Sequence, residues 1–566
     1  MPKLKDPESI DLHYYLHDLP TAQHKAGLAG LVLAIRSLEE RSAKEPEIIR
    51  PESVPSIQHL DNNSLSVQFT ERSIRGLFDD LYDASWEKTS SPQKRPKTAP
   101  IDVIERSEES SVGPGQIKQV KLYVYEDVRP RGTILEPLLP EGWLELWRDM
   151  IWQIPREKAT TRKPYEQRAN GQPCGEGLQT WKGVVKFDKA LKKNEFATGP
   201  VAGSLLLGAQ ASNAEGVPFV GRLDQNLLLH FWSLVVMISI PRQIDHDGKM
   251  TQVGFVIAIP EVSRLERFCN KLARVFHSLG EKQPDHRRPT RAFIDVPAQG
   301  ALQFVDSVSA MKSAQEEEGS WTVNAVDFCH FEKKGHNLKL LSSGRVFPDQ
   351  QLLEDYRDIV GRPNASKSYQ NPLFRAALML ALFERKPWWS ELANLFTRRD
   401  WRFFVSAADT KSDAPAIARL RWFWLDMTNK FRNEEEKRTN MPPDEATNST
   451  QRLPEIVKRL VATYVWARAK ERSKDDPKKL ATEREHVAQS LFLEFRSRRD
   501  QEFVDHFAGT FFAVGQWFER SSNDFEVLST CLIDRNADRR ADLKTLTLAA
   551  LSAASYTPKE QNGDQS

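Results

Sequence analysis

Two stretches of the chain alternate apolar and polar residues, as strands buried on one face do. Leu65, Val67 and Phe69 alternate with polar residues, and residues 120–125 repeat the pattern. A period of two places such side chains on one face of a sheet. We therefore expect a strand at each place, with a helix over residues 71–83 after the first.

Longer apolar runs indicate hairpins in the middle of the chain. Residues 227–240 and 251–259 are almost continuously apolar and flank an Asp247-Gly248 step. An Asp-Gly step is a strong hairpin signal, and arms without alternation are typical of a sheet covered on both faces. Residues 321–331 and 337–346 are arranged in the same way. We expect antiparallel hairpins at both places.

Beyond about residue 348 the strand pattern stops and helical spacing replaces it. Pro372 suits the first position of a helix, where its missing N–H costs least. The sequence thus predicts an α+β fold, with an N-terminal and central mixed domain containing antiparallel hairpins, followed by a C-terminal all-α helical bundle. The expected division is an α+β region at 1–347, a helical connecting region at 348–430, the bundle at 441–556 and a disordered tail at 557–566.

Residues 19–31 predict a helix with an apolar side and a bare side, the latter lined only by the small residues alanine and glycine. Thr21 can cap it, and Gly27 and Gly30 lie inside it. Each glycine costs a helix roughly 1 kcal/mol relative to alanine, so something is expected to pack close to the backbone. One alternative is a neighbouring helix or strand. The other is a ligand or nucleic acid that contacts polar residues of the first turn, Gln23, His24 and Lys25.

Two polar segments interrupt the apolar pattern. Residues 86–115 carry a basic half, an acidic half and scattered prolines, and we expect a mobile loop or linker there. Residues 429–450 are charged and contain prolines, which favours a second linker before a helix that starts at Pro454.

Composition places few limits on function. Eighty basic and 78 acidic residues leave a formal charge of +2, so nucleic-acid binding would depend on local patches. The four cysteines form no CxxC pair, which argues against a zinc ribbon and fits a reducing cytoplasm. The longest apolar run, 227–240, is too short for a membrane span. Fourteen tryptophans could stack on bases, but tryptophan more often fills cores and subunit interfaces.

The most basic window is residues 156–193, with ten cations against four carboxylates. Gly171, Gly175 and Gly177 predict an irregular middle, and two aromatic residues are interleaved. A basic, glycine-rich loop with aromatic residues can follow a phosphate backbone. A solvated surface loop is the alternative.

Residues 205–219, which we call the amide segment, are small, polar and turn-rich. The segment lacks the Gly-Lys-Ser/Thr ending of a phosphate-binding loop. The amides of Gln210 and Asn213 could read base edges, although such amides more often satisfy buried backbone groups.

No arrangement of residues indicates catalysis. His13 and His17 have no third ligand in sequence, and Cys329-His330 has no partner cysteine at zinc spacing. There is neither a nucleophile elbow nor a dinucleotide-binding fingerprint. We therefore expect no enzyme activity, metal or cofactor.

Three segments together resemble a CRISPR family. They are Leu-Pro-Thr-Ala-Gln-His-Lys-Ala-Gly-Leu-Ala-Gly-Leu at 19–31, Leu-Gly-Ala-Gln-Ala-Ser-Asn-Ala-Glu-Gly-Val-Pro-Phe at 207–219, and Leu-His-Phe-Trp at 229–232. The chain is similar in these segments to the large subunit of the type I-B, Myxococcus-type variant, of the Cascade effector complex. The order of domains agrees with that resemblance, whereas residues 86–115 match nothing in it.

The resemblance implies a non-catalytic subunit of an RNA-guided DNA-binding complex. Such a subunit lies at the 5′ end of the guide RNA, recognises the protospacer-adjacent motif in duplex DNA, helps to open the duplex and contacts the displaced strand, while base pairing reads the target. The implied partners are CRISPR RNA, target double-stranded DNA, the backbone and guide-end subunits of Cascade, and small subunits. Relatives act with a separate helicase–nuclease or, in other contexts, with transposition proteins.

The residues expected to contact nucleic acid come from the first helix, the basic window and the amide segment. They are Gln23, Lys25, Arg156, Arg162, Lys163, Lys182, Lys192, Lys193, Gln210, Asn213 and Arg222. Two alternatives remain at this point: a stand-alone metal-dependent nucleic-acid enzyme, and a purely structural assembly subunit.

The C-terminal bundle is expected to act like a small subunit. In this subtype the small subunit is often translated from an internal start, and Met427 and Met441 both precede the bundle. The alternative is that both are ordinary internal methionines.

Overall fold

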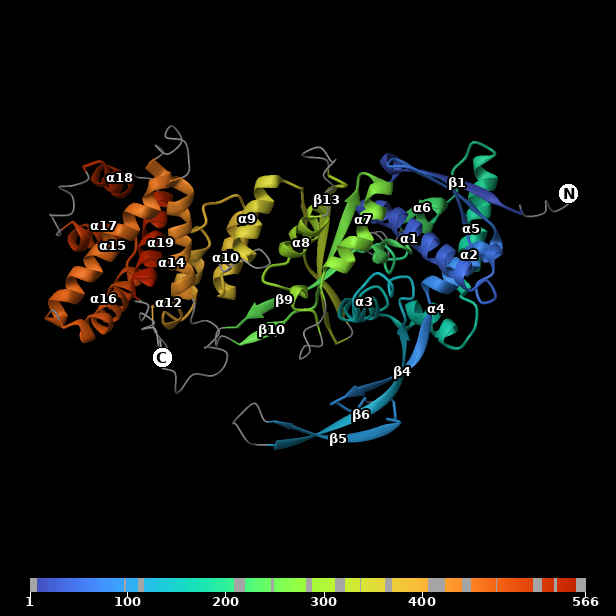
Figure 1. Ribbon diagram of the computed structural model, residues 1–566, viewed down its shortest axis with the longest axis horizontal. Coiled ribbons are helices and arrows are strands. Elements are labelled where there is room, and N and C mark those ends of the chain that lie inside the picture. The colour runs from blue at the N-terminus through green and yellow to red at the C-terminus, as the bar shows by residue number, and fades with distance from the viewer. Residues whose placement is uncertain are drawn as a thin grey trace, which may run out of the picture. The chain divides into compact units, whose positions relative to one another are not determined.

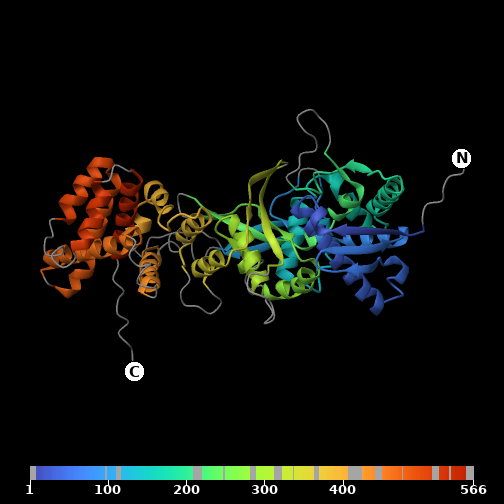
Figure 2. The same ribbon diagram turned by 90° about the horizontal axis from the view of Figure 1, so that it is seen from above.

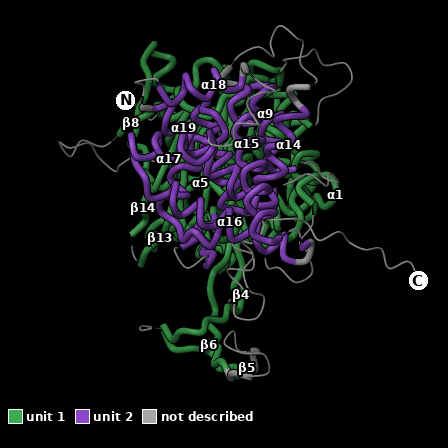
Figure 3. Tube along the Cα trace, turned by 90° about the vertical axis from the view of Figure 1, so that its left-hand side faces the viewer, with its two compact units in different colours: residues 1–241, 253–348 green, residues 242–252, 349–566 purple. Residues whose placement is uncertain are grey.

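The computed structural model describes most of the chain, in fourteen stretches. They are residues 8–95, 98–109, 117–207, 219–245, 249–280, 288–310, 321–335, 337–361, 369–405, 423–439, 449–474, 476–512, 522–533 and 537–555. By their contacts the residues divide into two compact units, coloured separately in Figure 3: a first unit of 1–241 and 253–348, and a second of 242–252 and 349–566. Sheets occupy the first unit and helices dominate the second, so the predicted α+β class with a C-terminal helical bundle is confirmed.

The first unit begins with a small antiparallel sheet in the order β1-β3-β2. Leu65, Val67 and Phe69 on β3 are fully buried, as their alternation predicts. Thr70 caps the helix that follows, in a reciprocal capping box with Ser73. The elements here are β1 (Ile10–Tyr15), α1 (Ala22–Lys44), β2 (Ser56–Leu60), β3 (Ser64–Phe69) and α2 (Glu71–Leu81).

The prediction of a loop over 86–115 is wrong at 86–91 and 102–109, which form strands, and residues 96, 97 and 110–115 lie outside the described residues. β4 (Ala84–Ser91) and β5 (Asp102–Glu109) pair on either side of β6 (Ile117–Pro130) in an antiparallel sheet that extends away from helices α3 and α4 (Figure 1). Both outer strands are rich in polar residues, and their own sequences show little alternation of apolar and polar positions. The apolar residues that make a sheet of them come from β6, across the pairing.

The basic window is helical rather than irregular, which corrects the second loop prediction. It follows α3 (Glu141–Gln153) and contains α4 (Ala159–Ala169) and α5 (Gly175–Leu191). Gly177 lies in the first turn of α5 because α2 passes close by. A Cβ at Gly177 would stand 3.1 Å from Cα of Arg75 and 3.2 Å from Cβ of Phe78. Close helix packing, and not a flexible loop, explains this glycine.

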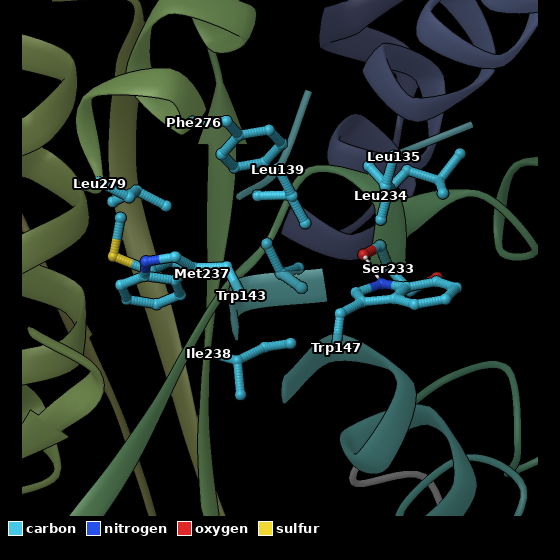
Figure 4. A pocket seen from close by; sticks show the side chains of 11 residues that line it. Leu135, Leu139, Trp143, Trp147, Ser233, Leu234, Met237, Ile238, Phe276 and Leu279 are labelled. Carbon is cyan, nitrogen blue, oxygen red and sulfur yellow. Dashed lines mark hydrogen bonds between the residues drawn. The ribbon is translucent and has the colours of Figure 1, made fainter. Parts of the chain in front are cut away.

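Trp143 and Trp147 of α3 belong to the core. They line an apolar pocket together with Met237, Ile238 and Phe276 (Figure 4). The indole N–H of Trp147 donates to the backbone oxygen of Ser233 at 2.8 Å. These two tryptophans therefore follow the core alternative and not the base-stacking one.

The central sheet has the order β10-β9-β11-β13-β14, with β12 parallel to β9. Both predicted hairpins are present, but the first apolar run forms a strand only from residue 237, because residues before it form α6 and a 3-10 turn at Trp232–Leu234. The remaining elements of this unit are β7 (Thr198–Pro200), β8 (Val220–Arg222), α6 (Leu223–Leu228), β9 (Met237–Ile244), β11 (Phe255–Val262), α7 (Leu265–Ser278), β12 (Phe293–Ile294), α8 (Ala298–Ser309), β13 (Val323–Lys334) and β14 (Asn337–Val346). The end of β9, and β10 (Met250–Gln252) which pairs with it, fall in the residues of the second unit.

The glycines of α1 are explained by close contact with a neighbouring backbone, the first of the two alternatives. A Cβ at Gly27 would lie 2.2 Å from the backbone oxygen of Leu228, and one at Gly30 would lie 2.1 Å from that of Phe231. The 19–31 and 229–232 segments are therefore packed together, α1 against the end of α6 and the turn after it. Only glycine permits this distance between the two backbones.

The second unit is a set of packed helices, drawn from yellow to red in Figure 2, with residues 242–252 as its one strand segment among those described. Pro372 begins α10 as predicted, capped by the side chain of Asn371. Helices α15, α16 and α19 pack on one another. The helices are α9 (Gln350–Val360), α10 (Pro372–Phe383), α11 (Leu392–Arg398), α12 (Arg402–Val405), α14 (Phe423–Thr439), α15 (Ser449–Ser473), α16 (Pro477–Ser497), α17 (Asp500–Phe511), α18 (Ser522–Ile533) and α19 (Ala537–Ala554).

The expected linker over 429–450 is wrong in its first half, since α14 continues to Thr439. Pro454 lies within α15, which begins at Ser449, and does not start it. Residues 440–448 and the tail at 557–566 lie outside the described residues. No described helix is long and apolar enough to cross a membrane.

Candidate nucleic-acid interface

Helix α5 and the turn that ends it carry lysines along their outward side. Lys182, Lys186, Lys189 and Lys193 follow one another at spacings of four, three and four residues, which places them on one face, and all four are exposed. Trp181 and Val184 are among the residues on the opposite side, which packs against α2 and α6. We call these four residues the α5 lysine face. Two of them, Lys182 and Lys193, were predicted to contact nucleic acid.

The other predicted cations of the window differ in their surroundings. Lys163 is exposed on α4, and Lys192 is exposed and paired with Asp188 at 2.6 Å. Arg162 is half-buried, donates to the backbone oxygen of Arg156 at 2.8 Å and lies over the ring of Trp152 at 4.3 Å. Arg162 therefore fastens the start of α4 to the end of α3.

Arg156 is buried, and the expectation that it belongs to an exposed basic loop is wrong. Its guanidinium donates to the hydroxyl of Tyr82 at 2.8 Å and lies against the ring of Tyr165. The Tyr82 hydroxyl also makes a 2.8 Å hydrogen bond with Nδ1 of His230. Removal from water, with Arg156 as the second cause, lowers the pKa of His230 to about 3. This network holds the 229–232 segment in place.

A second buried imidazole lies in α1. His24 is enclosed in the interior, and its Nδ1 makes a 2.8 Å contact with the hydroxyl of the N-cap Thr21. Burial lowers the pKa of His24 to about 4. Both histidines are therefore neutral in the folded chain over a pH range in which unfolded histidine takes up a proton.

Acidification is expected to destabilise the first unit for this reason. The unfolded chain binds more protons than the folded one between pH 6.5 and the lowered pKa values, so stability falls as the pH decreases through this range. At roughly pH 5 each histidine lowers the free energy of unfolding by about 2 kcal/mol relative to its value at neutral pH. Thermal unfolding of wild type and of the His24→Gln/His230→Gln variant at the two pH values checks this. A wild-type midpoint as pH-independent as that of the variant would contradict it.

The first-turn residues of α1 have structural contacts. The Lys25 ammonium pairs with Glu261 at 2.6 Å, and Arg345 reaches the other oxygen of the same carboxylate at 3.1 Å. The side chain of Gln23 is buried, and its amide nitrogen has no hydrogen-bond partner among the described residues. A nucleic-acid role for Lys25 and Gln23 stays a prediction that these contacts do not favour.

A two-stranded ribbon, β7 paired with β8, lies beside α5. Its inner side is made by Gly199 and Gly221, where a Cβ would meet Leu223 at 2.6 Å and the Asn226 side chain at 2.3 Å. Phe196, which precedes β7, and Val220 of β8 are 62% and 63% exposed. The glycines let the ribbon lie flat on α6, which leaves large apolar side chains in contact with solvent.

Arg222 joins the ribbon to α5. Its guanidinium pairs with Asp224 at 2.8 Å and lies 4.6 Å from the ring centre of Phe196 and 5.5 Å from that of Phe187 on α5. Cations beside exposed aromatic rings are the elements of a surface for nucleic-acid strands. Sequence reasoning missed Phe196 and Val220, because the pairing of residues 198–200 with 220–222 leaves no local pattern in the sequence.

Gln210 and Asn213 lie outside the described residues. Hydrogen bonds hold the described chain on either side of them. The backbone N–H of Val201 donates to the oxygen of Phe219 at 2.8 Å, and the indole of Trp232 donates to the oxygen of Leu205 at 2.8 Å. The amide segment is therefore held beside the ribbon at Phe219 and against Trp232 at Leu205.

Comparison with known families accounts for the fold. The model described as the type I-B CRISPR Cas8b N-terminal domain matches residues 54–318, and the model described as the type I-B CRISPR Cas8b C-terminal domain matches residues 323–554. The chain is thus a large subunit of a CRISPR effector, and it belongs to the type I-B Cas8b family. No curated protein matches it.

The three segments that resemble the CRISPR family differ in their position relative to the matched ranges. The 207–219 and 229–232 segments fall inside the first matched range, whereas 19–31 precedes it. A Cas8b subunit is part of a Cascade complex that contains CRISPR RNA and other Cas subunits. Within the described residues, no group of three or more histidine, cysteine or acidic side chains is placed to hold a metal ion.

Proposed function

We propose that this subunit recognises the protospacer-adjacent motif in target duplex DNA and helps to open the duplex. Further parts of the proposal are contacts with the 5′ end of the guide RNA and with the displaced strand, and no catalytic role. The observation that carries it is the α5 lysine face beside the β7–β8 ribbon. Lysines supply sequence-independent attraction to phosphates, and the ribbon adds exposed Phe196 and Val220.

The amide segment supplies what lysines lack. Phosphate contacts position a protein on DNA, whereas base-edge contacts specify the sequence. Gln210 and Asn213 have both donors and acceptors, and the described chain after their segment is hydrogen-bonded at the ribbon through Phe219. We propose that they read the motif while the α5 lysine face holds the backbone of the same duplex.

The C-terminal helical bundle at 441–556 acts like a small subunit in this proposal. A product starting at Met441 would contain α15 to α19, whereas Met427 is fully buried inside α14, so a start there would divide that helix. The proposed partners are target DNA, CRISPR RNA, backbone, guide-end and small subunits, and a helicase–nuclease or transposition proteins, acting in the cytoplasm.

The Gln210→Ala/Asn213→Ala variant of the assembled complex tests the motif-reading part. Its affinity for a duplex with the motif is expected to fall roughly tenfold or more, since a good base-edge pair discriminates by about 1–3 kcal/mol. Affinity for a duplex with a scrambled motif stays unchanged. Filter binding or anisotropy on the two duplexes measures both values.

Gln172→Ala serves as the matched control, because this exposed amide lies in the turn between α4 and α5. It is expected to leave both affinities unchanged. If the double variant binds both duplexes like wild type, or loses both equally, the amides do not read the motif.

A further inference from the structure

A small cavity lies beside Arg156 in the first unit, where the ends of α2 and α3 meet α4 and the 229–232 segment. The space in it that is open to a water-sized particle is about 10 Å³, which is room for one such particle. A nucleotide or a phosphate group is too large to fill it. The polar residues that line the cavity are Tyr82, Arg156, Tyr165, Ser204, His230 and Ser233.

Arg156 brings a positive charge to this cavity without a matching negative one. The residue is 8% exposed, and its guanidinium donates to the neutral hydroxyl of Tyr82 at 2.8 Å. Among the described residues no carboxylate oxygen lies within 4.0 Å of it, and the charge of Glu176 acts on it only from farther away. Buried charges in proteins are normally paired, so Arg156 lacks the counter-charge that its burial calls for.

The aromatic rings around Arg156 compensate for this only in part. Its guanidinium carbon lies 5.2 Å from the ring centre of Tyr82 and 6.0 Å from that of Tyr165. The face of a ring attracts a cation through its quadrupole but carries no net charge. The cavity therefore stays electropositive at the guanidinium.

The hydrogen bonds also leave the cavity with more donors than acceptors. Because Arg156 donates to the oxygen of Tyr82, the O–H of Tyr82 can donate to Nδ1 of His230, 2.8 Å away. This assignment places the imidazole proton of His230 on Nε2, which has no hydrogen-bond partner among the described residues. The hydroxyls of Tyr165, Ser204 and Ser233 can donate as well. Such a lining suits a particle that only accepts hydrogen bonds.

We propose that the cavity binds one chloride ion, held by the guanidinium of Arg156 and the Nε2–H of His230. Chloride is the common small anion nearest to water in size, it accepts hydrogen bonds, and it neutralises the buried arginine. A water molecule fits the space but supplies no charge.

This anion site goes beyond the proposed DNA recognition, because it acts on the stability of the first unit. Trp232 and Leu205 also line the cavity, and the indole of Trp232 donates to the backbone oxygen of Leu205 at 2.8 Å. A bound chloride would therefore hold the 229–232 segment and the start of the amide segment together.

Thermal unfolding of the full chain in sodium chloride and in sodium gluconate, each at about 0.3 M, tests the proposal, because gluconate is too large for the cavity. A site with a dissociation constant of roughly 10 mM raises the ratio of folded to unfolded chain about 30-fold in chloride. The unfolding midpoint is then expected to be higher in chloride by about 4 °C. Equal midpoints of the wild type in the two salts would overturn the proposal and leave water as the occupant.

Arg156→Met keeps the length of the side chain without its charge and is expected to abolish the difference between the salts, whereas Arg156→Lys keeps part of it. Arg41→Met is the matched control, since Arg41 pairs with Asp80 and needs no anion. It is expected to keep the full difference. A difference that persists in Arg156→Met would mean that the salts act on the chain in general, which also overturns the proposal.

Chloride NMR of the wild-type chain gives an answer even if Arg156→Met does not fold. The ³⁵Cl line is expected to broaden in the presence of the protein, and the excess width per chloride is expected to fall as added chloride saturates the site. An excess width that is absent, or that shows no saturation, would contradict a chloride site.

Discussion

Replacing Gly30 with alanine is expected to destabilise the first unit by about 3 kcal/mol, at the upper end of what one added methyl group costs in a packed core. The new Cβ would lie 2.1 Å from the backbone oxygen of Phe231, and a Cβ at Gly27 would lie 2.2 Å from that of Leu228. Backbone atoms cannot rotate away as a side chain can. Helix α1 or the 228–231 segment must therefore move.

The measurement is unfolding by heat or denaturant, followed by circular dichroism and limited proteolysis. Gly183→Ala is the matched control, because it lies in helix α5 of the same unit and its Cβ would meet Leu223 at an ordinary 3.8 Å. This control is expected to be neutral or to gain up to about 1 kcal/mol from helix propensity. Equal midpoints for Gly30→Ala and wild type would show that α1 is not packed as described.

Changing all four residues of the α5 lysine face to glutamine is expected to lower the affinity of the assembled complex for target DNA roughly 100-fold at about 0.1 M salt. Each lysine that neutralises a phosphate releases a counterion, and the four effects add along one strand. The fold is expected to persist, because all four side chains are exposed and the packed side of α5 is untouched.

The decrease is expected to be equal for duplexes with and without the motif, since phosphate contacts carry no sequence information. The charge-matched control changes four other exposed lysines of the first unit to glutamine, Lys44, Lys121, Lys334 and Lys339. This control is expected to keep its affinity. Equal decreases in the two variants would mean that net charge, and not the α5 lysine face, attracts DNA.

The sequence predicted elements that have a local pattern of their own. The alternation at Leu65, Val67 and Phe69, and the proline at the start of α10, mark structure within a few residues. The hairpin of β13 and β14 was equally visible, with Gly335 in its turn at a positive φ of 62°. The bare side of α1 correctly indicated close packing, but it did not identify the packed segment.

The elements that were missed depend on contacts between distant residues. β4 and β5 are polar strands that become recognisable only beside β6. Gly177 was interpreted as a loop residue because the segment packed against it, at Arg75, is about a hundred residues away in sequence. Arg156 counted as a surface cation because nothing local reveals that Tyr82 and His230 enclose it. The ribbon joins two triplets on either side of the amide segment, a pairing that local patterns do not show.

The most direct test of a DNA-binding first unit is a salt titration of the assembled complex on target duplex, for wild type and for the glutamine variant of the α5 lysine face. The slope of log affinity against log salt is expected to be shallower in the variant by about 3 to 4, close to one unit for each phosphate that a lysine no longer neutralises. Parallel lines for the two proteins would contradict the account, because the α5 lysines would then bind no phosphate.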